Sequence, residues 1–253
     1  MNVRMGRSLT RVGSMPRRVA RMLSGLLVLF ALESVAFAAT LTVPGDHATI
    51  QAAINAAVDG DRIEVAPGTY TGALNFNGKS IELIGTGGPS VTIVDGNNST
   101  PILLRVNSSE NNSTLIQGFT FQRANSNNSN EGGIRINSDV TMRDCVVANN
   151  FDEDTGFSAR MYSGIVVQGG SPRFERVTLH SNTSDANGGF DHWLVPGFYI
   201  GGSSTVTIVD STIRNNLVDG SGIDHLSAPI FVNSANAVVN LEQVLIHDNV
   251  DSL

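Results

Sequence analysis

The strongest constraint on the fold is a repeat that occupies the second half of the chain. The pattern apolar-x-x-Asn recurs at Val147–Asn150, Leu179–Asn182, Ile213–Asn216 and Ile246–Asn249, at nearly constant intervals. A second column keeps step with it at Gly133-Ile134, Gly164-Ile165, Gly197-Phe198 and Pro229-Ile230. Two columns in step over four repeats indicate a solenoid, whose repeats bury their apolar faces only by stacking on each other.

The repeating segments are typical of strands. They are short, β-branched and alternating, as in Val206-Thr207-Ile208-Val209, and Gly, Asn, Ser and Asp separate them. No run of ten or more residues has the spacing that a helical repeat requires. The predicted fold class is therefore all-β, a right-handed parallel β-helix. In the less regular first half, strands are expected at 62–65, 81–84, 91–94, 102–106 and 115–121.

The repeat also predicts which side chains face inward. Val147, Leu179, Ile213 and Ile246 form one inward column, and Cys145, Val177, Ser211 and Val244 form another. Cys145 is the only cysteine, so no disulfide can form within the chain, and a buried thiol is expected. The recurring Asn150, Asn182, Asn216 and Asn249 predict a ladder in which each amide bonds the next coil.

Residues 1–38 are predicted to be a secretion signal. Six arginines precede the apolar run 23–32, which is too short to span a bilayer, and Ala36-Phe37-Ala38 matches a cleavage pattern. Cleavage after Ala38 leaves 22 acidic against 10 basic residues, a formal net charge of −12. Such a surface excludes nucleic acid as a partner and disfavours polyanions unless cations bridge them. The mature chain lacks a further apolar stretch long enough to span a membrane, so it is expected to be secreted, periplasmic or attached to a cell surface.

Residues 39–60 are predicted to cap the stack, and residues 61–253 to form its coils. Thr49 can cap a short helix over 50–58 with an apolar face that covers the first coil. Ala48-Thr49-Ile50-Gln51-Ala52-Ala53-Ile54, followed by the segments 60–70 and 79–85, resembles the opening of pectin-lyase-like β-helix proteins. The later coils resemble the repeats of bacterial surface β-helix proteins, including the polymorphic outer-membrane proteins. This resemblance implies the fold and leaves the activity open, because the fold serves lyases, hydrolases, esterases and adhesins.

One constellation could carry chemistry. Gly189-Phe190-Asp191-His192-Trp193 and Gly222-Ile223-Asp224-His225-Leu226 occupy the same place in adjacent coils, and Arg160 holds it one coil earlier. The candidate catalytic residues are Asp191, His192, Asp224, His225 and Arg160. Stacked carboxylates can share a proton and supply a general acid, and an Asp can orient a His as a base. Trp193, Tyr162 and Tyr199 are the candidate sugar-stacking residues. The same Asp-His pairs could instead cap turn backbone groups. The motifs of polygalacturonases, pectin methylesterases and pectate lyases are absent from the sequence.

An acidic cluster is the candidate metal site. Asp152, Asp154 and Asp185 fall in corresponding loops and could bind calcium through carboxylate oxygens, although the spacing of known calcium β-rolls is absent. A solvated acidic edge is the alternative interpretation.

Three functions remain open at this point. The first is a secreted or surface β-helix protein that binds carbohydrate or another surface ligand without turnover. The second is a divergent polysaccharide lyase or glycoside hydrolase, and the third is a structural stretch of a larger adhesin. The last coil is expected to lack a cap, which predicts self-association through this end, and a monomer in light scattering would contradict that prediction.

Overall fold

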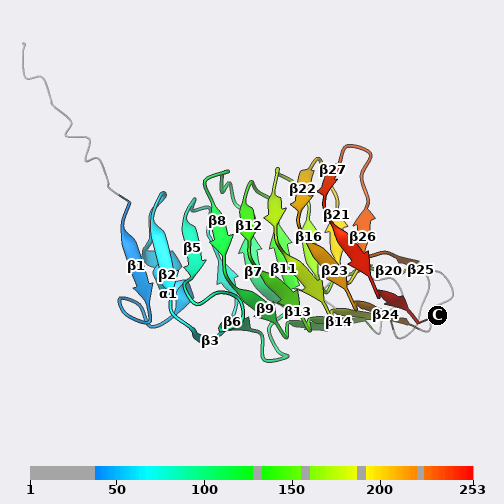
Figure 1. The fold of residues 1–253 in the computed structure, drawn as a ribbon, viewed down its shortest axis with the longest axis horizontal. Coiled ribbons are helices and arrows are strands. Elements are labelled where there is room, and N and C mark those ends of the chain that lie inside the picture. The colour runs from blue at the N-terminus through cyan, green and yellow to red at the C-terminus, as the bar shows by residue number, and fades with distance from the viewer. Residues whose placement is uncertain (1–37, 128–132, 155–159, 187–191, 221–224, 253) are drawn as a thin grey trace, which may run out of the picture. The chain divides into compact units, whose positions relative to one another are not determined.

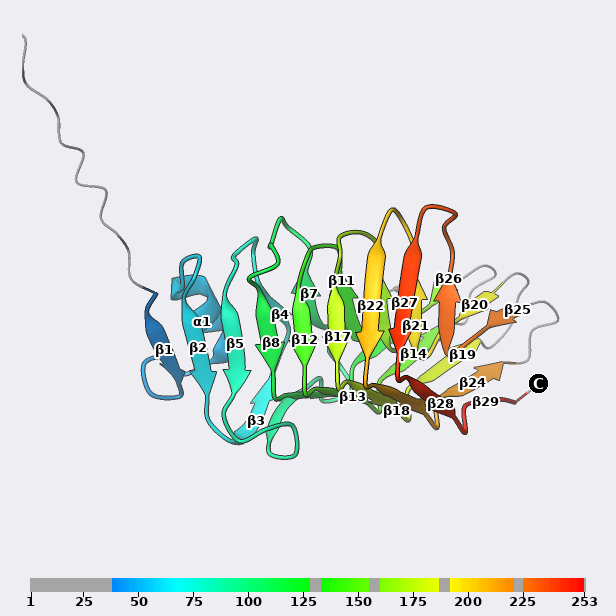
Figure 2. The same ribbon diagram turned by 45° about the horizontal axis from the view of Figure 1, so that its top comes forward.

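The computed structural model describes residues 38–127, 133–154, 160–186, 192–220 and 225–252. The compact unit begins at Ala38, and all of the predicted signal before this residue lies outside the described part. The strands pair in parallel in successive coils, from β1 (Thr40–Val43) at the start of the unit to β29 (Val250–Asp251) at its end (Figure 1, Figure 2). The predicted right-handed parallel β-helix with a short N-terminal helix is confirmed.

Three parallel sheets form the walls of the stack. Sheet A contains, in order, β1 (Thr40–Val43), β2 (Arg62–Val65), β5 (Glu82–Gly85), β8 (Leu115–Gln117), β12 (Thr141–Arg143), β17 (Arg173–Glu175), β22 (Thr205–Val209) and β27 (Val238–Glu242). Sheet B contains β3 (Gly68–Thr71), β6 (Thr92–Asp95), β9 (Thr120–Gln122), β13 (Val146–Ala148), β18 (Thr178–His180), β23 (Thr212–Arg214) and β28 (Leu245–His247). Sheet C contains β4 (Leu74–Asn75), β7 (Ile102–Val106), β11 (Gly133–Ile136), β16 (Ile165–Val167), β21 (Phe198–Ile200) and β26 (Ile230–Val232). Figure 2 shows the strands of sheet A side by side.

The later coils carry an extension, which we call the arm, between sheets B and C. Its outgoing strands form sheet D: β10 (Asn125–Asn127), β14 (Phe151–Asp154), β19 (Thr183–Ala186), β24 (Leu217–Gly220) and β29 (Val250–Asp251). Its returning strands form sheet E: β15 (Arg160–Met161), β20 (His192–Leu194) and β25 (His225–Ser227). A small apolar cluster of Met161, Leu194 and Val218 fills the arm separately from the main core.

The core runs through the centre of the coils as columns of stacked side chains. Val147, Leu179 and Ile213 are in register in sheet B, and all three are fully buried, as predicted. Phe174 from sheet A meets Phe198 from sheet C edge to face, with 4.9 Å between ring centroids, so the sheets interlock across the interior. Each such buried side chain contributes roughly 1.5–3 kcal/mol through the apolar surface that it removes from water.

Single residues in the left-handed region make two sharp bends in each later coil. Gly118, Asp144, Arg176, Asp210 and Gln243 lie between sheets A and B with φ of 80°, 50°, 51°, 49° and 54°. Arg123, Asn149, Ser181, Asn215 and Asp248 follow sheet B with φ of 56°, 55°, 55°, 52° and 52°. The prediction of one strand over 115–121 is therefore wrong, because the bend at Gly118 divides it into β8 and β9. The predictions for β2 and β7 match the structure, and those for β5 and β6 are shifted by one residue.

The predicted asparagine ladder is present. Asn182 Oδ1 accepts the backbone N–H of Asn150 at 3.1 Å and its side-chain N–H at 3.0 Å. The same two bonds join Asn182 to Asn216 and Asn216 to Asn249. Each ladder amide therefore satisfies buried backbone groups at the bend, where regular strand pairing is interrupted.

The helix α1 (Ile50–Ala56) covers the first coil. Thr49 caps it, since its hydroxyl accepts the Ala52 N–H at 3.1 Å, and Ile50, Ala53 and Ile54 are buried. Gln51 binds the backbone of Asn75 through both amide atoms, and so satisfies polar groups on the edge strand β4. The helix ends two residues earlier than the predicted Val58.

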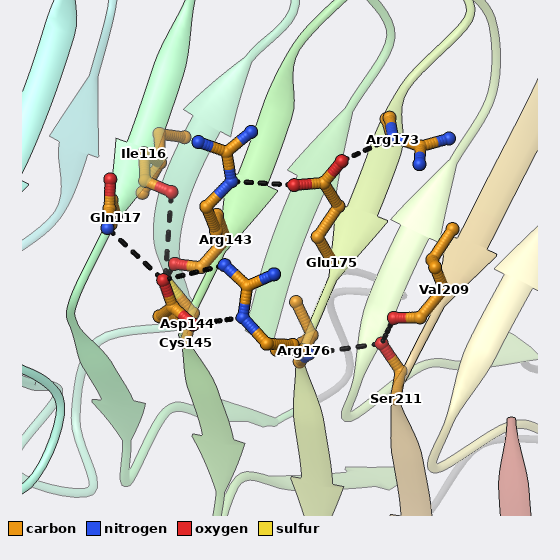
Figure 3. A network of polar contacts seen from close by, with 11 residues as sticks. Ile116, Gln117, Arg143, Asp144, Cys145, Arg173, Glu175, Arg176, Val209 and Ser211 are labelled. Atoms are coloured by element: carbon orange, nitrogen blue, oxygen red, sulfur yellow. Dashed lines mark hydrogen bonds and ion pairs between the residues drawn. The ribbon is translucent and has the colours of Figure 1, made fainter. Parts of the chain in front are cut away.

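Salt bridges on the outer face of sheet A and at the neighbouring bend join adjacent coils (Figure 3). Arg176 binds Asp144 with two nitrogens, at 2.6 and 3.0 Å, across one coil step. Glu175 accepts from Arg143 and Arg173. The hydrogen bond from Arg176 is the main cause that lowers the pKa of Asp144, and the bond from Arg173 is the main cause that lowers the pKa of Glu175.

Acid is expected to destabilise this stack. The unfolded chain holds protons on Asp and Glu with pKa values near 3.9 and 4.3, and the folded chain binds them less tightly. The stabilisation by Asp144 and Glu175 is thus complete above about pH 5 and is lost as the pH falls toward about 3. Arg176→Gln should lower the melting temperature at pH 7 and reduce this acid dependence. Thermal unfolding at constant ionic strength checks this, and an unchanged acid dependence in the variant would contradict it.

The last described coil is exposed on its open side. Leu241 and Ile246 continue inward columns, but they are 50% and 43% exposed because no described coil stacks on them. Ile246 keeps the predicted register with Ile213 and differs from it only in burial. Self-association through this surface stays a prediction.

Candidate functional site

The predicted site residues lie on the arm and on the adjacent outer face of sheet C. The strands of sheet E hold Arg160, His192, Trp193 and His225, and β21 holds Tyr199. Asp191 and Asp224 lie outside the described residues. All of the described candidates for catalysis and stacking are therefore on neighbouring strands of two sheets or directly beside them.

The backbone register of sheet E agrees with the predicted stacking of coils. His192 pairs with His225, and Arg160 pairs with Trp193. The side chains of both histidines are outside the description, as are both aspartates. The proposed Asp-His patch consequently stays a prediction, since the structure describes only the backbone pairing of its two histidines.

An aromatic cluster, which we call the platform cluster, joins sheets E and C. The ring centroids of Trp193 and Phe231 are 5.6 Å apart, and Tyr199 stacks on both at 6.3 and 6.1 Å. Tyr162 packs on Tyr199 with centroids 4.3 Å apart. The guanidinium carbon of Arg160 lies 4.4 Å from the Trp193 ring centroid, which is a cation–π contact.

The members of this cluster differ in exposure. Tyr162 and Tyr199 are 3% and 4% exposed, whereas Trp193 and Phe231 are half-buried and Arg160 is exposed. The burial of the two tyrosines contradicts a direct stacking role for them. Their rings form a buried layer with Val166 and Val195, and Trp193 and Phe231 pack against this layer. Within the cluster, it is Trp193, Phe231 and Arg160 that can contact a ligand from solvent.

The sequence analysis missed Phe231. The available signal was its place directly after the second column, where Val166, Tyr199 and Phe231 are in register in sheet C. Ile165 and Phe198 lie in the core and Ile230 packs against it, so the middle residue of each strand faces outward. This alternation could have placed Phe231 beside Tyr199.

A hydrogen bond holds the Tyr199 side chain in place, and burial holds that of Tyr162. The side-chain amide of Asn233 donates to the Tyr199 hydroxyl at 2.9 Å. Burial is the main cause that raises the pKa of Tyr162, and the neighbouring Tyr199 raises it further. Tyr162 thus stays a neutral phenol at physiological pH and is unsuited to act as a base there.

The candidate calcium ligands are not brought together by the described geometry. The Asp152 carboxylate is fully buried and accepts from the Ser126 hydroxyl and the Tyr162 N–H, both at 2.7 Å. Asp152 is in register with Ser184, while Asp185 is in register with Glu153, so Asp152 and Asp185 face opposite sides of sheet D. The Asp154 side chain is outside the description. Among the described residues, no three His, Cys, Asp or Glu side chains are grouped to hold a metal ion.

A separate groove of about 420 Å³ lies at the start of the stack, between α1 and the strands β3 and β4. Its lining includes Thr49, Gln51, Thr69, Tyr70 and Leu74. In this first coil β3 is the edge strand of sheet B, and α1 lies beside it where a further strand would otherwise pair. No sequence motif pointed to it, and it shares no residue with the platform cluster.

Cys145 behaves as predicted. The thiol is 1% exposed in the inward column with Val177, and burial raises its pKa to about 12. It is therefore an unreactive core thiol at neutral pH.

Comparison with solved structures gives a weak similarity. The structure of rice weevil pectin methyl esterase matches with 12% sequence identity and a TM-score of 0.30, over 84% of this chain and 88% of that chain. At this identity and TM-score, the match carries no information about activity. No protein-family model matches the chain, and no curated protein matches it. No helix in the described part is long and apolar enough to cross a membrane.

Proposed function

We propose that this chain is a secreted or cell-surface β-helix protein that binds a neutral carbohydrate without turnover. The ligand would lie on Trp193 and Phe231, beside the Arg160 guanidinium that lies over the Trp193 ring. The observation that carries the proposal is the half-exposed pair of rings at 5.6 Å, backed by a buried layer of two tyrosines. The apolar faces of sugar rings pack on such aromatic surfaces, while charged and polar groups at the edge bind hydroxyls.

Rigidity and charge support a neutral glycan. The platform stands on paired strands of sheets C and E, so few side chains must be ordered on binding. The chain after Ala38 has a formal net charge of −12, which repels polygalacturonate and alginate. The positive charge of Arg160, over the Trp193 ring, does not offset this net negative charge.

Trp193 makes the proposal directly testable, because it is the only tryptophan in the chain. The mature chain, residues 39–253, is titrated with each member of a panel of neutral and acidic oligosaccharides. The Trp193 fluorescence should shift with a neutral oligosaccharide that binds. Trp193→Ala should weaken binding at least about tenfold in calorimetry, equivalent to about 1.4 kcal/mol, and Phe231→Ala should weaken it less. Tyr70→Phe, in the distant groove, is the control and should bind normally. Normal binding by Trp193→Ala would contradict the platform.

The enzyme alternative is kept open by the alignment of His192 with His225. The same panel should be assayed for new reducing ends and for unsaturated products, with and without calcium. Product formation that disappears in Asp191→Ala and Asp224→Ala would replace the binding proposal with a lyase or hydrolase. No response to any glycan would favour a structural stretch of an adhesin.

A further inference from the structure

The buried carboxylate of Asp61 accepts a hydrogen bond from the backbone N–H of Ala39. The distance from Ala39 N to Asp61 Oδ1 is 2.7 Å, and Asp61 is only 4% exposed. The other oxygen, Oδ2, accepts the Val58 N–H at 2.9 Å. The Ala39 carbonyl accepts the Arg62 N–H at 2.8 Å, so both backbone groups of Ala39 are held where the pairing of β1 with β2 begins.

The charge of this carboxylate has no cationic partner among the described residues. The neighbouring Arg62 binds Glu64 and Glu82 instead, at 2.9 and 3.0 Å. The Asp61 carboxylate, which is largely removed from water, thus accepts only from two neutral backbone N–H groups among the described residues. Such a charge is costly unless a positive group accompanies it.

The position of Ala39 in the sequence supplies a positive group. Ala36-Phe37-Ala38 is the predicted cleavage pattern, the compact unit begins at Ala38, and both Ala38 and Ala39 are exposed to solvent. We propose that a peptidase hydrolyses the Ala38–Ala39 bond and that the new α-ammonium group of Ala39 forms an ion pair with Asp61. Water adds across the peptide bond, Ala38 leaves as a carboxylate, and the released amine holds the transferred protons as an ammonium group.

Processing therefore changes the stability of the first coil. In the precursor, Ala39 offers a neutral amide with one N–H. In the mature chain it offers a charged group with three N–H donors, so the attraction between opposite charges adds to the hydrogen bond that the carboxylate already accepts. The ion pair between Ala39 and Asp61 stabilises the pairing of the edge strand β1 with β2, and it can form only after the signal has been removed. This inference is independent of the proposed glycan binding.

The first test compares thermal unfolding of the mature chain with a free or an acetylated amino terminus at Ala39. The free form should melt about 2–4 °C higher, and Asp61→Asn should abolish the difference between the two forms. Asp46→Asn is the matched control, because Asp46 accepts from Thr42 on the same strand and makes no bond to Ala39. A difference that persists in Asp61→Asn, or that is absent from the wild type, would overturn the proposal.

A second measurement keeps the proposal testable even if Asp61→Asn unfolds. Reductive methylation with ¹³C-formaldehyde labels only two amines in the mature chain, the amino terminus and Lys79, the single lysine. The pH titration of the terminal signal should give a pKa about one unit above the ordinary α-amino range of about 7.7–8.0. An ordinary value would refute the ion pair, and mass spectrometry of the exported protein that shows another first residue would refute the cleavage site.

Discussion

Gly164→Ala is expected to destabilise the protein by about 2–4 kcal/mol, because Gly164 stands where adjacent coils touch through their backbones. A β-carbon at this buried position would overlap the carbonyl oxygens of Pro196 and Gly197 in the next coil. The Gly197 carbonyl cannot turn away, since it accepts the Ile165 N–H at 2.9 Å. The coils would have to move apart and lose hydrogen bonds in sheet C. This explains the glycine column that the repeat shows at Gly133, Gly164 and Gly197.

Gly169→Ala provides the control for this substitution. A β-carbon at Gly169 would lie 3.5 Å from the Asn137 carbonyl oxygen, an ordinary contact, in the turn that leads away from the same strand. The variant should have nearly the stability of the wild type, or gain up to about 1 kcal/mol, because alanine restricts the unfolded chain. Urea unfolding of both variants measures the difference. Equal stabilities would show that coil contact does not require glycine at position 164.

Asn182→Ala is expected to cost about 3–5 kcal/mol, because Asn182 is a fully buried member of the ladder. The fully buried Asn182 amide accepts two N–H groups of Asn150 and donates to Val147 and Asn216. Alanine would leave the Asn150 backbone N–H in the interior without its partner. The cost arises from removing this donor from water, since the deleted side chain contributes little apolar burial.

Asn249→Ala tests whether position in the stack sets the size of this effect. Asn249 is the last ladder residue and makes the same contacts to Asn216, but it is half-buried. Water can replace the lost acceptor there, so the loss in urea unfolding should stay near about 1 kcal/mol. Similar losses for Asn182→Ala and Asn249→Ala would mean that burial does not determine the strength of the ladder.

The acidic residues of the arm show where prediction from the repeat failed. Asp152 and Asp185 fall in corresponding segments of adjacent coils, but the pairing of β14 with β19 places Asp185 next to Glu153. A shift of a single residue in register reverses the face on which a strand side chain lies. The intervals between repeats vary slightly from coil to coil and leave that shift undetermined, so convergence of these carboxylates could not be judged in advance.

The two tyrosines show a second limit. Tyr199 alternates with inward-facing residues, and an outward position in an isolated sheet would be exposed. Trp193 on the returning strand β20, and Val195 directly after it, pack over this face, and so the Tyr162 and Tyr199 rings are covered. Burial on the outside of a β-helix depends on how a distant segment folds back, which periodicity does not report.

The class of fold, the inward columns and the asparagine ladder follow from the amino-acid sequence without any coordinates. Stacked coils place equivalent residues on top of each other, so Val147, Leu179 and Asn182 reveal their environment by recurring. Only the tertiary structure shows that Phe231 packs against Trp193 at the surface and that Asp61 accepts a hydrogen bond from Ala39. These features depend on contacts between segments without repeated partners, and such contacts leave no period in the sequence.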